Sequence, residues 1–134
     1  MAEFKGGCAC GAVRYEASAE PIFSGLCHCT SCQKLTGSAF LPVVAIPTAT
    51  LKVTGTTTQF DSKGDSGMAT HRNFCPVCGS TVFDSADMMA DVTMITVGTL
   101  DNPDIVKPMM QIYCDSALSW SKVPDLQGFP KMPG

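Results

Sequence analysis

Short stretches of alternating apolar and polar residues run through most of the chain. From Val13 to Ser18, the residues Val, Tyr and Ala alternate with Arg, Glu and Ser, which is the period of a half-buried β-strand. No stretch of ten or more residues has the 3.6-residue period of an amphipathic helix. The pattern therefore predicts a mainly β fold.

Other short runs rich in β-branched and aromatic residues predict further strands, about eight in all. Pro42 lacks a backbone N–H, so we expect its strand to lie at a sheet edge or to be bulged. The segment Thr30–Thr36 predicts one helical turn, which Gly37 ends. The further predicted strands are Ala39–Ile46, Leu51–Val53, Thr57–Phe60, Met68–Phe74, Thr81–Phe83, Val92–Thr99 and Met110–Cys114.

The length of 134 residues fits a single domain, residues 1–134, because no linker or repeat divides the chain. The end of the chain contains Pro124, Pro130 and Pro133. Proline favours extended backbone, so we expect about residues 123–134 to form an extended tail over the surface.

Hydrophobic residues make up 45% and charged residues 16% of the chain, as in ordinary globular proteins. The formal net charge of −3 lacks the basic excess of a nucleic-acid-binding protein. The longest apolar run, Ala39–Ile46, contains Pro42 and is too short to cross a bilayer, and residues 1–7 lack the apolar segment of a signal peptide. We therefore expect a soluble cytoplasmic protein without nucleic-acid or membrane partners, and the sequence leaves its oligomeric state open.

Seven of the eight cysteines fall into three clusters. An even number of cysteines is also typical of a disulfide framework. However, Cys8 and Cys10 lie two residues apart, as do Cys27 and Cys29, and such neighbours cannot bridge each other without strain. A reducing cytoplasm would also keep thiols free. The spacing therefore favours metal binding, with zinc as the expected cofactor and two ions per chain.

Two of the clusters, Cys8-x-Cys10 and Cys75-Pro-Val-Cys78-Gly79, are pairs. Two pairs on separate tight turns supply the four thiolates of a closed, tetrahedral structural zinc site. Pro76 shapes the second turn, and Gly79 permits a positive φ next to the metal. We therefore assign Cys8, Cys10, Cys75 and Cys78 to one structural zinc.

The third cluster, Cys27-His28-Cys29-x-x-Cys32, supplies three thiolates and leaves one corner of a second zinc site open. A thiol that coordinates zinc is deprotonated, so a small thiol is the expected ligand at this corner. Alternatively, Cys114 or a histidine closes the site and makes it structural. We expect His28, between two ligands, to point away from the metal and to form hydrogen bonds, and His71 to be a polar surface group.

Together these motifs resemble those of the glutathione-dependent formaldehyde-activating (GFA) family, which includes centromere protein V-like domains. The residues that carry the resemblance are Gly7-Cys8-x-Cys10-Gly11-x-Val13, Cys27-His28-Cys29-x-x-Cys32, Arg72-x-Phe74-Cys75-Pro76-x-Cys78-Gly79, Val97-Gly98-Thr99-Leu100-Asp101 and Trp120. The similarity covers nearly the whole chain.

The resemblance implies a β-tent fold, a structural zinc on the two pairs and a second zinc on the triple, with the substrate thiol near it. It also implies an activity, the formation of S-(hydroxymethyl)glutathione from glutathione and formaldehyde, which is a carbon–sulfur lyase reaction in reverse. Many members carry His where this chain has Gln111, and no family role transfers to Cys114.

We therefore predict a carbon–sulfur lyase-type enzyme that acts on a small thiol adduct, with Cys27, Cys29 and Cys32 at the reacting centre. Lys34 and Arg72 are candidate anchors for substrate carboxylates, since a charge-assisted hydrogen bond from either would orient the ligand. Two other functions are open: a non-catalytic zinc module that binds a protein partner, and a redox enzyme resembling methionine sulfoxide reductases that uses Cys114.

Overall fold

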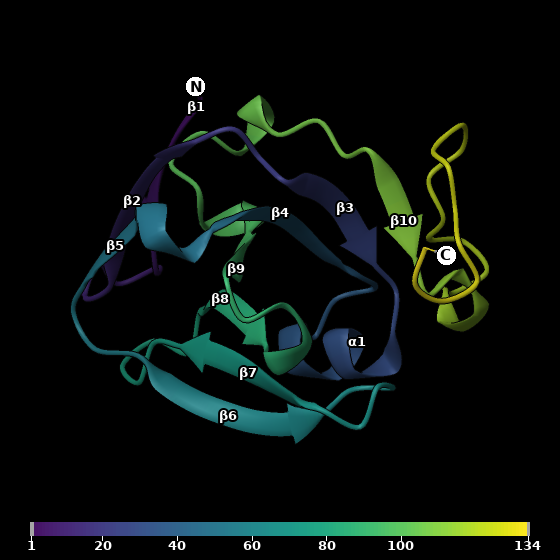
Figure 1. Cartoon of the computed structure of the whole chain (residues 1–134), viewed down its shortest axis with the longest axis horizontal. Helices are drawn as coiled ribbons and strands as arrows, with labels where there is room; N and C mark the ends of the chain where they lie inside the picture. The colour runs from purple at the N-terminus through teal and green to yellow at the C-terminus, as the bar shows by residue number, and fades with distance from the viewer. Residues whose placement is uncertain (1, 134) are drawn as a thin grey trace.

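The computed structural model describes residues 2–133, which form two β-sheets and one short α-helix (Figure 1). The predicted fold class, mainly β with the β-tent type of zinc fold, is confirmed. The strands are β1 (Ala2–Gly7), β2 (Arg14–Ala19), β3 (Phe23–Cys27), β4 (Leu41–Pro47), β5 (Leu51–Thr54), β6 (Thr58–Lys63), β7 (Ala69–Phe74), β8 (Thr81–Ala86), β9 (Val92–Thr96) and β10 (Met110–Ile112).

The helix α1 spans Thr30–Thr36 and ends at Gly37 with a φ of 68°, as the sequence predicted. It begins after Cys29, whose Sγ accepts a hydrogen bond from the amide of Cys32. Within residues 2–133, no helix is long and apolar enough to cross a bilayer. The remaining helical turns are 3₁₀ segments at Thr48–Thr50, Asp87–Met89, Val97–Thr99, Pro103–Ile105 and Cys114–Ser116.

The larger sheet has seven strands in the order β10-β3-β4-β9-β8-β7-β6, and the smaller sheet has the order β1-β2-β5. All paired strands are antiparallel except β10 and β3, which are parallel. The larger sheet curves, so that β3 and β10 on one arm and β6 and β7 on the other lie on either side of α1 (Figure 1).

Pro42 does not lie in an edge strand, so that prediction was wrong. β4 is a central strand between β3 and β9. Pro42 pairs with Leu26 of β3, but the pairing with β9 begins only at Val43. At the other end of β4, Pro47 pairs with β9 beyond the last residue paired with β3. Each proline therefore lies where β4 has a neighbour on one side only, and a central strand can accommodate it there.

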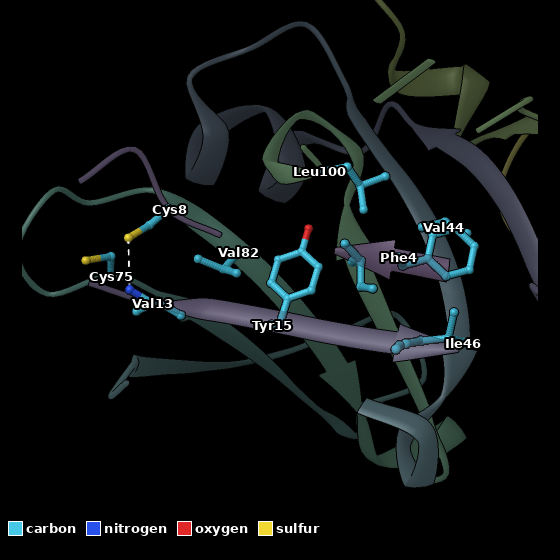
Figure 2. Packing of buried hydrophobic residues seen from close by; sticks show 11 residues of the cluster. Phe4, Cys8, Val13, Tyr15, Val44, Ile46, Cys75, Val82 and Leu100 are labelled. Atoms are coloured by element: carbon cyan, nitrogen blue, oxygen red, sulfur yellow. Dashed lines mark hydrogen bonds between the residues drawn. The ribbon is translucent and has the colours of Figure 1, made fainter. Parts of the chain in front are cut away.

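The main hydrophobic core lies between the two sheets (Figure 2). This cluster includes Tyr15 of β2, Val44 and Ile46 of β4 and Val82 of β8. The hydroxyl of Tyr15 lies 2.8 Å from Oγ1 of Thr99, so its polar end has a partner. Cys8 and Cys75 belong to the same buried cluster, so one cysteine of each predicted pair is part of the core.

The C-terminal segment follows β10 and lies beside it (Figure 1). The amide of Gln111 donates to the carbonyl of Gln127, and the amide of Phe129 donates to the carbonyl of Gln111. The amide of Tyr113 donates to the carbonyl of Lys131. These bonds attach the tail to the edge of the larger sheet over residues 127–131. Gly134, the last residue of the predicted tail, lies outside the described residues.

Candidate metal centres and the adjoining cavity

The four cysteines of the two predicted pairs converge on one point, where their sulfur atoms all lie within 4.8 Å of one another. Cys8 and Cys10 come from the turn between β1 and β2, and Cys75 and Cys78 come from the turn between β7 and β8. Cys8 and Cys75 are buried, whereas Cys10 and Cys78 are exposed. We call this group the closed cluster.

The two turns of the closed cluster have similar hydrogen bonds. In the first, the amide of Cys8 donates to the carbonyl of Val13. In the second, the amide of Cys75 donates to the carbonyl of Ser80. In both turns the acceptor lies five residues after the donor. Gly11 and Gly79 follow the second cysteine of each turn and have φ values of 83° and 79°, a region that glycine adopts without strain. The positive φ predicted for Gly79 is confirmed.

The geometry of the closed cluster fits zinc. With Zn–S bonds of about 2.3 Å, a regular tetrahedron has sulfur atoms about 3.8 Å apart. The Sγ atoms of Cys8 and Cys10 are 3.6 Å apart, and those of Cys10 and Cys75 are 3.8 Å apart. These distances far exceed a disulfide bond of about 2.05 Å. The sulfur atoms are therefore spaced as ligands of one tetrahedral ion.

Backbone amides point at the sulfur atoms of the closed cluster. The amide of Val13 donates to Sγ of Cys8 at 3.2 Å (Figure 2), and the amide of Val77 donates to Sγ of Cys75 at 3.4 Å. Hydrogen bonds with Ser80 lower the pKa of Cys78 to about 5. Donors of this kind stabilise thiolates, which are the form of cysteine that binds metal.

The third predicted cluster also assembles, and we call it the open cluster. Cys27 ends β3, Cys29 precedes α1, and Cys32 lies in the first turn of α1, with all three sulfur atoms within 4.8 Å of one another. The hydrogen bond between Cys27 and Cys29 has the largest effect on both thiols: it lowers the pKa of Cys29 and raises the pKa of Cys27. Three thiolates this close require a cation, and a soft S₃ donor set suits zinc.

No fourth ligand completes the open cluster among the residues from 2 to 133: no other His, Cys, Asp or Glu joins the three cysteines. Cys114, one alternative, lies elsewhere, with its Sγ 3.6 Å from the carbonyl oxygen of Gln111. His28 and His71, the chain's two histidines, are also engaged away from the group. The described residues therefore leave one tetrahedral corner available.

The open cluster lies in the wall of a cavity of about 650 Å³. This volume is within the range of about 300–1,000 Å³ that ligand-binding pockets have. Residues from both arms of the larger sheet line it, including Ile112 on β10 and Thr70 on β7, and residues 130–132 of the tail complete the wall. Cys27 and Cys29 are only partly buried, so the cluster is accessible from this cavity.

A buried ion pair lies beside the open cluster. Nη1 of Arg72 lies 2.9 Å from Oδ2 of Asp84 and 3.5 Å from Sγ of Cys32. The side chains of Arg72 and Asp84 are only 11% and 3% exposed. Burial raises the pKa of Asp84 to about 6, although Arg72 opposes the shift. Arg72 thus places a positive charge next to a metal-binding sulfur.

His28 is fully buried and forms hydrogen bonds, as predicted. Its Nε2 lies 3.0 Å from Oε1 of Gln111, and its ring packs against Phe40 at a centroid distance of 5.3 Å. The side-chain amide of Gln111 also donates to the carbonyls of Val123 and Leu126. Gln111 therefore joins the loop of the open cluster to the C-terminal tail, which gives a structural role to the position where many family members carry His.

Two predicted residues lie apart from the open cluster. Lys34 is exposed on α1 and is not among the residues that line the cavity, so its role as an anchor stays a prediction. His71 lies between Asp61 and Asp87, with both N–O distances 2.7 Å. Hydrogen bonds with these carboxylates, Asp61 first, raise the pKa of His71 above its usual value.

Sequence reasoning missed Asp84 and Tyr113, both of which line the cavity. Asp84 interrupts the apolar residues of β8, and a lone acidic residue in a buried strand was a usable signal. Tyr113 has a φ of 56°, which is uncommon for an aromatic residue, and no sequence pattern indicated it. Burial raises the pKa of Tyr113 to about 12.

A family model described as glutathione-dependent formaldehyde-activating enzyme matches residues 3–116, which include both clusters. A crystal structure of a Rhodobacter sphaeroides protein from a structural genomics programme is similar at a TM-score of 0.61 and 21% sequence identity. The match covers 78% of this chain and 96% of that chain, and at this identity it supports the fold alone. No curated protein matches the chain.

Proposed function

The chain belongs to the glutathione-dependent formaldehyde-activating enzyme family, and from this premise we propose that it forms or cleaves a carbon–sulfur bond in a small thiol adduct. Glutathione is the proposed thiol, and formaldehyde is the carbonyl compound that the family name implies. The observation that supports the proposal most directly is the open cluster in the wall of a 650 Å³ cavity. A purely structural metal site would need neither the free corner nor the cavity.

Zinc held by Cys27, Cys29 and Cys32 would keep an incoming thiol deprotonated at neutral pH. The chain itself must then balance the negative charge of several thiolates. Arg72 donates toward Sγ of Cys32, and the amide of Cys32 donates to Sγ of Cys29 at 3.3 Å. Both contacts favour the thiolate form of the ligands, so we assign Arg72 to this role rather than to a substrate carboxylate.

In the synthetic direction, the thiolate sulfur attacks the carbonyl carbon and the new carbon–sulfur bond forms. The π electrons of the carbonyl move to its oxygen, which then takes a proton. Tyr113 supplies a hydroxyl in the cavity wall, and a phenol is protonated at neutral pH, so we assign it as the donor to this oxygen. Solvent returns the proton to Tyr113. The cleavage direction reverses these steps.

The experiment that tests the proposal is exchange NMR with glutathione and ¹³C-formaldehyde, which measures how fast the adduct interconverts with its components. We expect the zinc-loaded protein to accelerate exchange. Cys29→Ser should fold but return the rate to that of the uncatalysed reaction, because it removes a ligand of the open cluster. Cys114→Ser is the matched control, since Cys114 lies outside the cavity, and it should keep the wild-type rate.

Other outcomes would identify the alternatives. If the protein neither accelerates exchange nor binds glutathione by calorimetry, the non-catalytic zinc module is the better description. If an activity toward methionine sulfoxide is lost in Cys114→Ser and kept in Cys29→Ser, the redox alternative replaces the proposal.

A further inference from the structure

The cavity beside the open cluster has a wall that formaldehyde does not explain. Five of the chain's eight methionines line it: Met68, Met88, Met89, Met94 and Met132. They come from four separate segments, namely the β6–β7 turn, the 3₁₀ turn Asp87–Met89, β9 and the tail. Because distant parts of the chain each contribute a methionine, the apolar surface is a property of the cavity and not of one element.

Several of these methionines remain open to solvent. Met68, Met88 and Met132 are 46%, 52% and 39% exposed, so they are not gap-filling core residues. Apolar side chains that gather around a concave space mark a ligand site, and methionine suits one because its flexible thioether adapts to the ligand. Single exposed residues such as Met109, which is outside the cavity, are ordinary.

The charged residues that line the cavity are arranged differently from the methionines. The exposed residues Lys63, Asp65, Asp115 and Lys131 carry both signs among the residues that line the cavity. The buried charges are those of Arg72 and Asp84, which pair with each other. The exposed charges suit the charged groups of glutathione. Inside the cavity, by contrast, a buried carboxylate or ammonium of the ligand would lack a free partner and would be costly to desolvate.

Formaldehyde adds only one carbon and one oxygen to glutathione, and its hydroxymethyl group is polar. Such a group would leave the methionine surface wet. We propose that the carbonyl compound handled here carries an apolar group of several carbon atoms, which the methionine wall covers in the adduct. This inference rests on the proposed function, because it takes the adduct to be bound at the open cluster.

The test measures binding of stable thioether analogues to the zinc-loaded protein by calorimetry. S-methylglutathione mimics the formaldehyde adduct, and S-hexylglutathione mimics the adduct of a longer aldehyde with the same tripeptide. Burial of each methylene favours binding by about two- to fourfold, so we expect S-hexylglutathione to bind at least roughly thirtyfold more tightly. Affinities within about threefold of each other would overturn the inference and leave the proposed function intact.

Substitutions of the methionines test whether the hexyl group binds at the methionine wall. The double substitution Met88→Gln with Met89→Gln lies on a short surface turn, so the fold should survive. It should weaken S-hexylglutathione about tenfold or more and leave S-methylglutathione unchanged. Met132→Gln, in the tail, is a second variant that should act in the same direction. Met109→Gln is the matched control and should change neither affinity.

The two hypotheses fail in different ways. If glutathione and both thioethers fail to bind, the proposed function is wrong and this inference falls with it. If S-hexylglutathione binds more tightly but equally so to the Met88/Met89 double variant, Met132→Gln and wild type, the methionine wall is not its site and the inference is overturned.

Discussion

The closed and open clusters use the same ligand chemistry in different surroundings. Two similar turns form the closed cluster, and Cys8 and Cys75 continue directly into the main core. The end of one strand and the start of α1 form the open cluster, which faces a cavity instead. The first arrangement supplies a complete set of four ligands, and the second leaves a corner beside space for a ligand. The surroundings, and not the cysteines themselves, therefore distinguish the closed cluster from the one that we propose to be reactive.

The clusters also differ in what stabilises their thiolates. Around the closed cluster the donors include backbone amides, such as those of Val13 and Val77. The open cluster has the amide of Cys32 and, in addition, the guanidinium of Arg72. A side-chain cation can offset the extra negative charge of an incoming thiolate, which fixed amides of a complete site need not do.

The largest expected effect comes from Cys75→Ser, which removes a ligand of the closed cluster. A structural zinc site contributes about 10–16 kcal/mol, comparable with or larger than the typical net stability of about 5–15 kcal/mol. We expect the variant to be unfolded or insoluble, as judged by circular dichroism and zinc content. Cys29→Ser, in the open cluster, should stay folded and lose one zinc. Folded Cys75→Ser protein with a wild-type melting temperature would remove the distinction between the clusters.

The next effect comes from Arg72→Met, which leaves Asp84 buried without its partner. Breaking a buried pair costs about 3–5 kcal/mol of unfolding free energy. The pKa of Asp84 is already raised to about 6 and should rise further, so its stability contribution is present at low pH and lost as the pH rises through that pKa. The deficit of the variant, measured by urea unfolding, should therefore shrink as the pH falls toward 6 and stay near its smallest value below pH 6.

Arg14→Met provides the matched control for this comparison. Arg14 and Asp101 form two short hydrogen bonds, but both side chains are about half exposed. Breaking an exposed pair costs about 1 kcal/mol or less. Equal losses in the two variants would show that burial beside the open cluster does not distinguish Arg72.

A smaller effect is expected for Tyr113→Phe, which removes the proposed donor to the carbonyl oxygen. The exchange rate with glutathione and ¹³C-formaldehyde should fall roughly 10- to 100-fold, with the melting temperature unchanged. Tyr15→Phe, at the only other tyrosine, should keep the wild-type exchange rate but lower the stability. The Tyr15 hydroxyl is hydrogen-bonded to Thr99 in the core, and loss of this bond costs about 1 kcal/mol. A wild-type rate in Tyr113→Phe would assign the donor to another group.

The smallest effect concerns His71, which lies in neither cluster. Its pKa is raised by Asp61 and Asp87, and that of Asp61 is lowered by His71. The contribution of this contact is present below the unfolded pKa of His, about 6.5, and is lost as the pH rises through the folded value or falls through that of Asp61. The difference in melting temperature between wild type and His71→Gln should therefore peak in mildly acidic solution. A pH-independent difference would contradict this assignment.

Both cysteine clusters and α1 could be predicted because their signals are local. Zinc-ligand spacing and a glycine after the last ligand specify a turn whatever the rest of the fold does, and Gly37 and Gly79 both have the positive φ expected. β1 and β3 were missed because their sequences, AEFKGG and FSGLC, have no β-branched residues. Each becomes a strand because its neighbours supply the pairing, which sequence periodicity does not record.

The cavity could not be predicted because it depends on how distant segments meet. Met94, Asp84 and Met132 become neighbours of the open cluster only after the larger sheet curves and the tail joins β10.

The strand predicted at Val92–Thr99 is longer than the observed strand for a related reason. The observed strand ends at Thr96, and residues 97–99 form a 3₁₀ turn whose Thr99 bonds Tyr15 of the other sheet.

The spacing of the ligands along the chain has a consequence for biosynthesis. The three cysteines of the open cluster lie within residues 27–32 and can meet as soon as that short stretch leaves the ribosome. The closed cluster needs Cys78, which follows Cys32 by 78 − 32 = 46 residues, and at about 5–20 residues per second that delay is roughly 2–9 s. The nascent chain can therefore complete its open cluster before its closed cluster, and the tail segment that lines the cavity emerges after both.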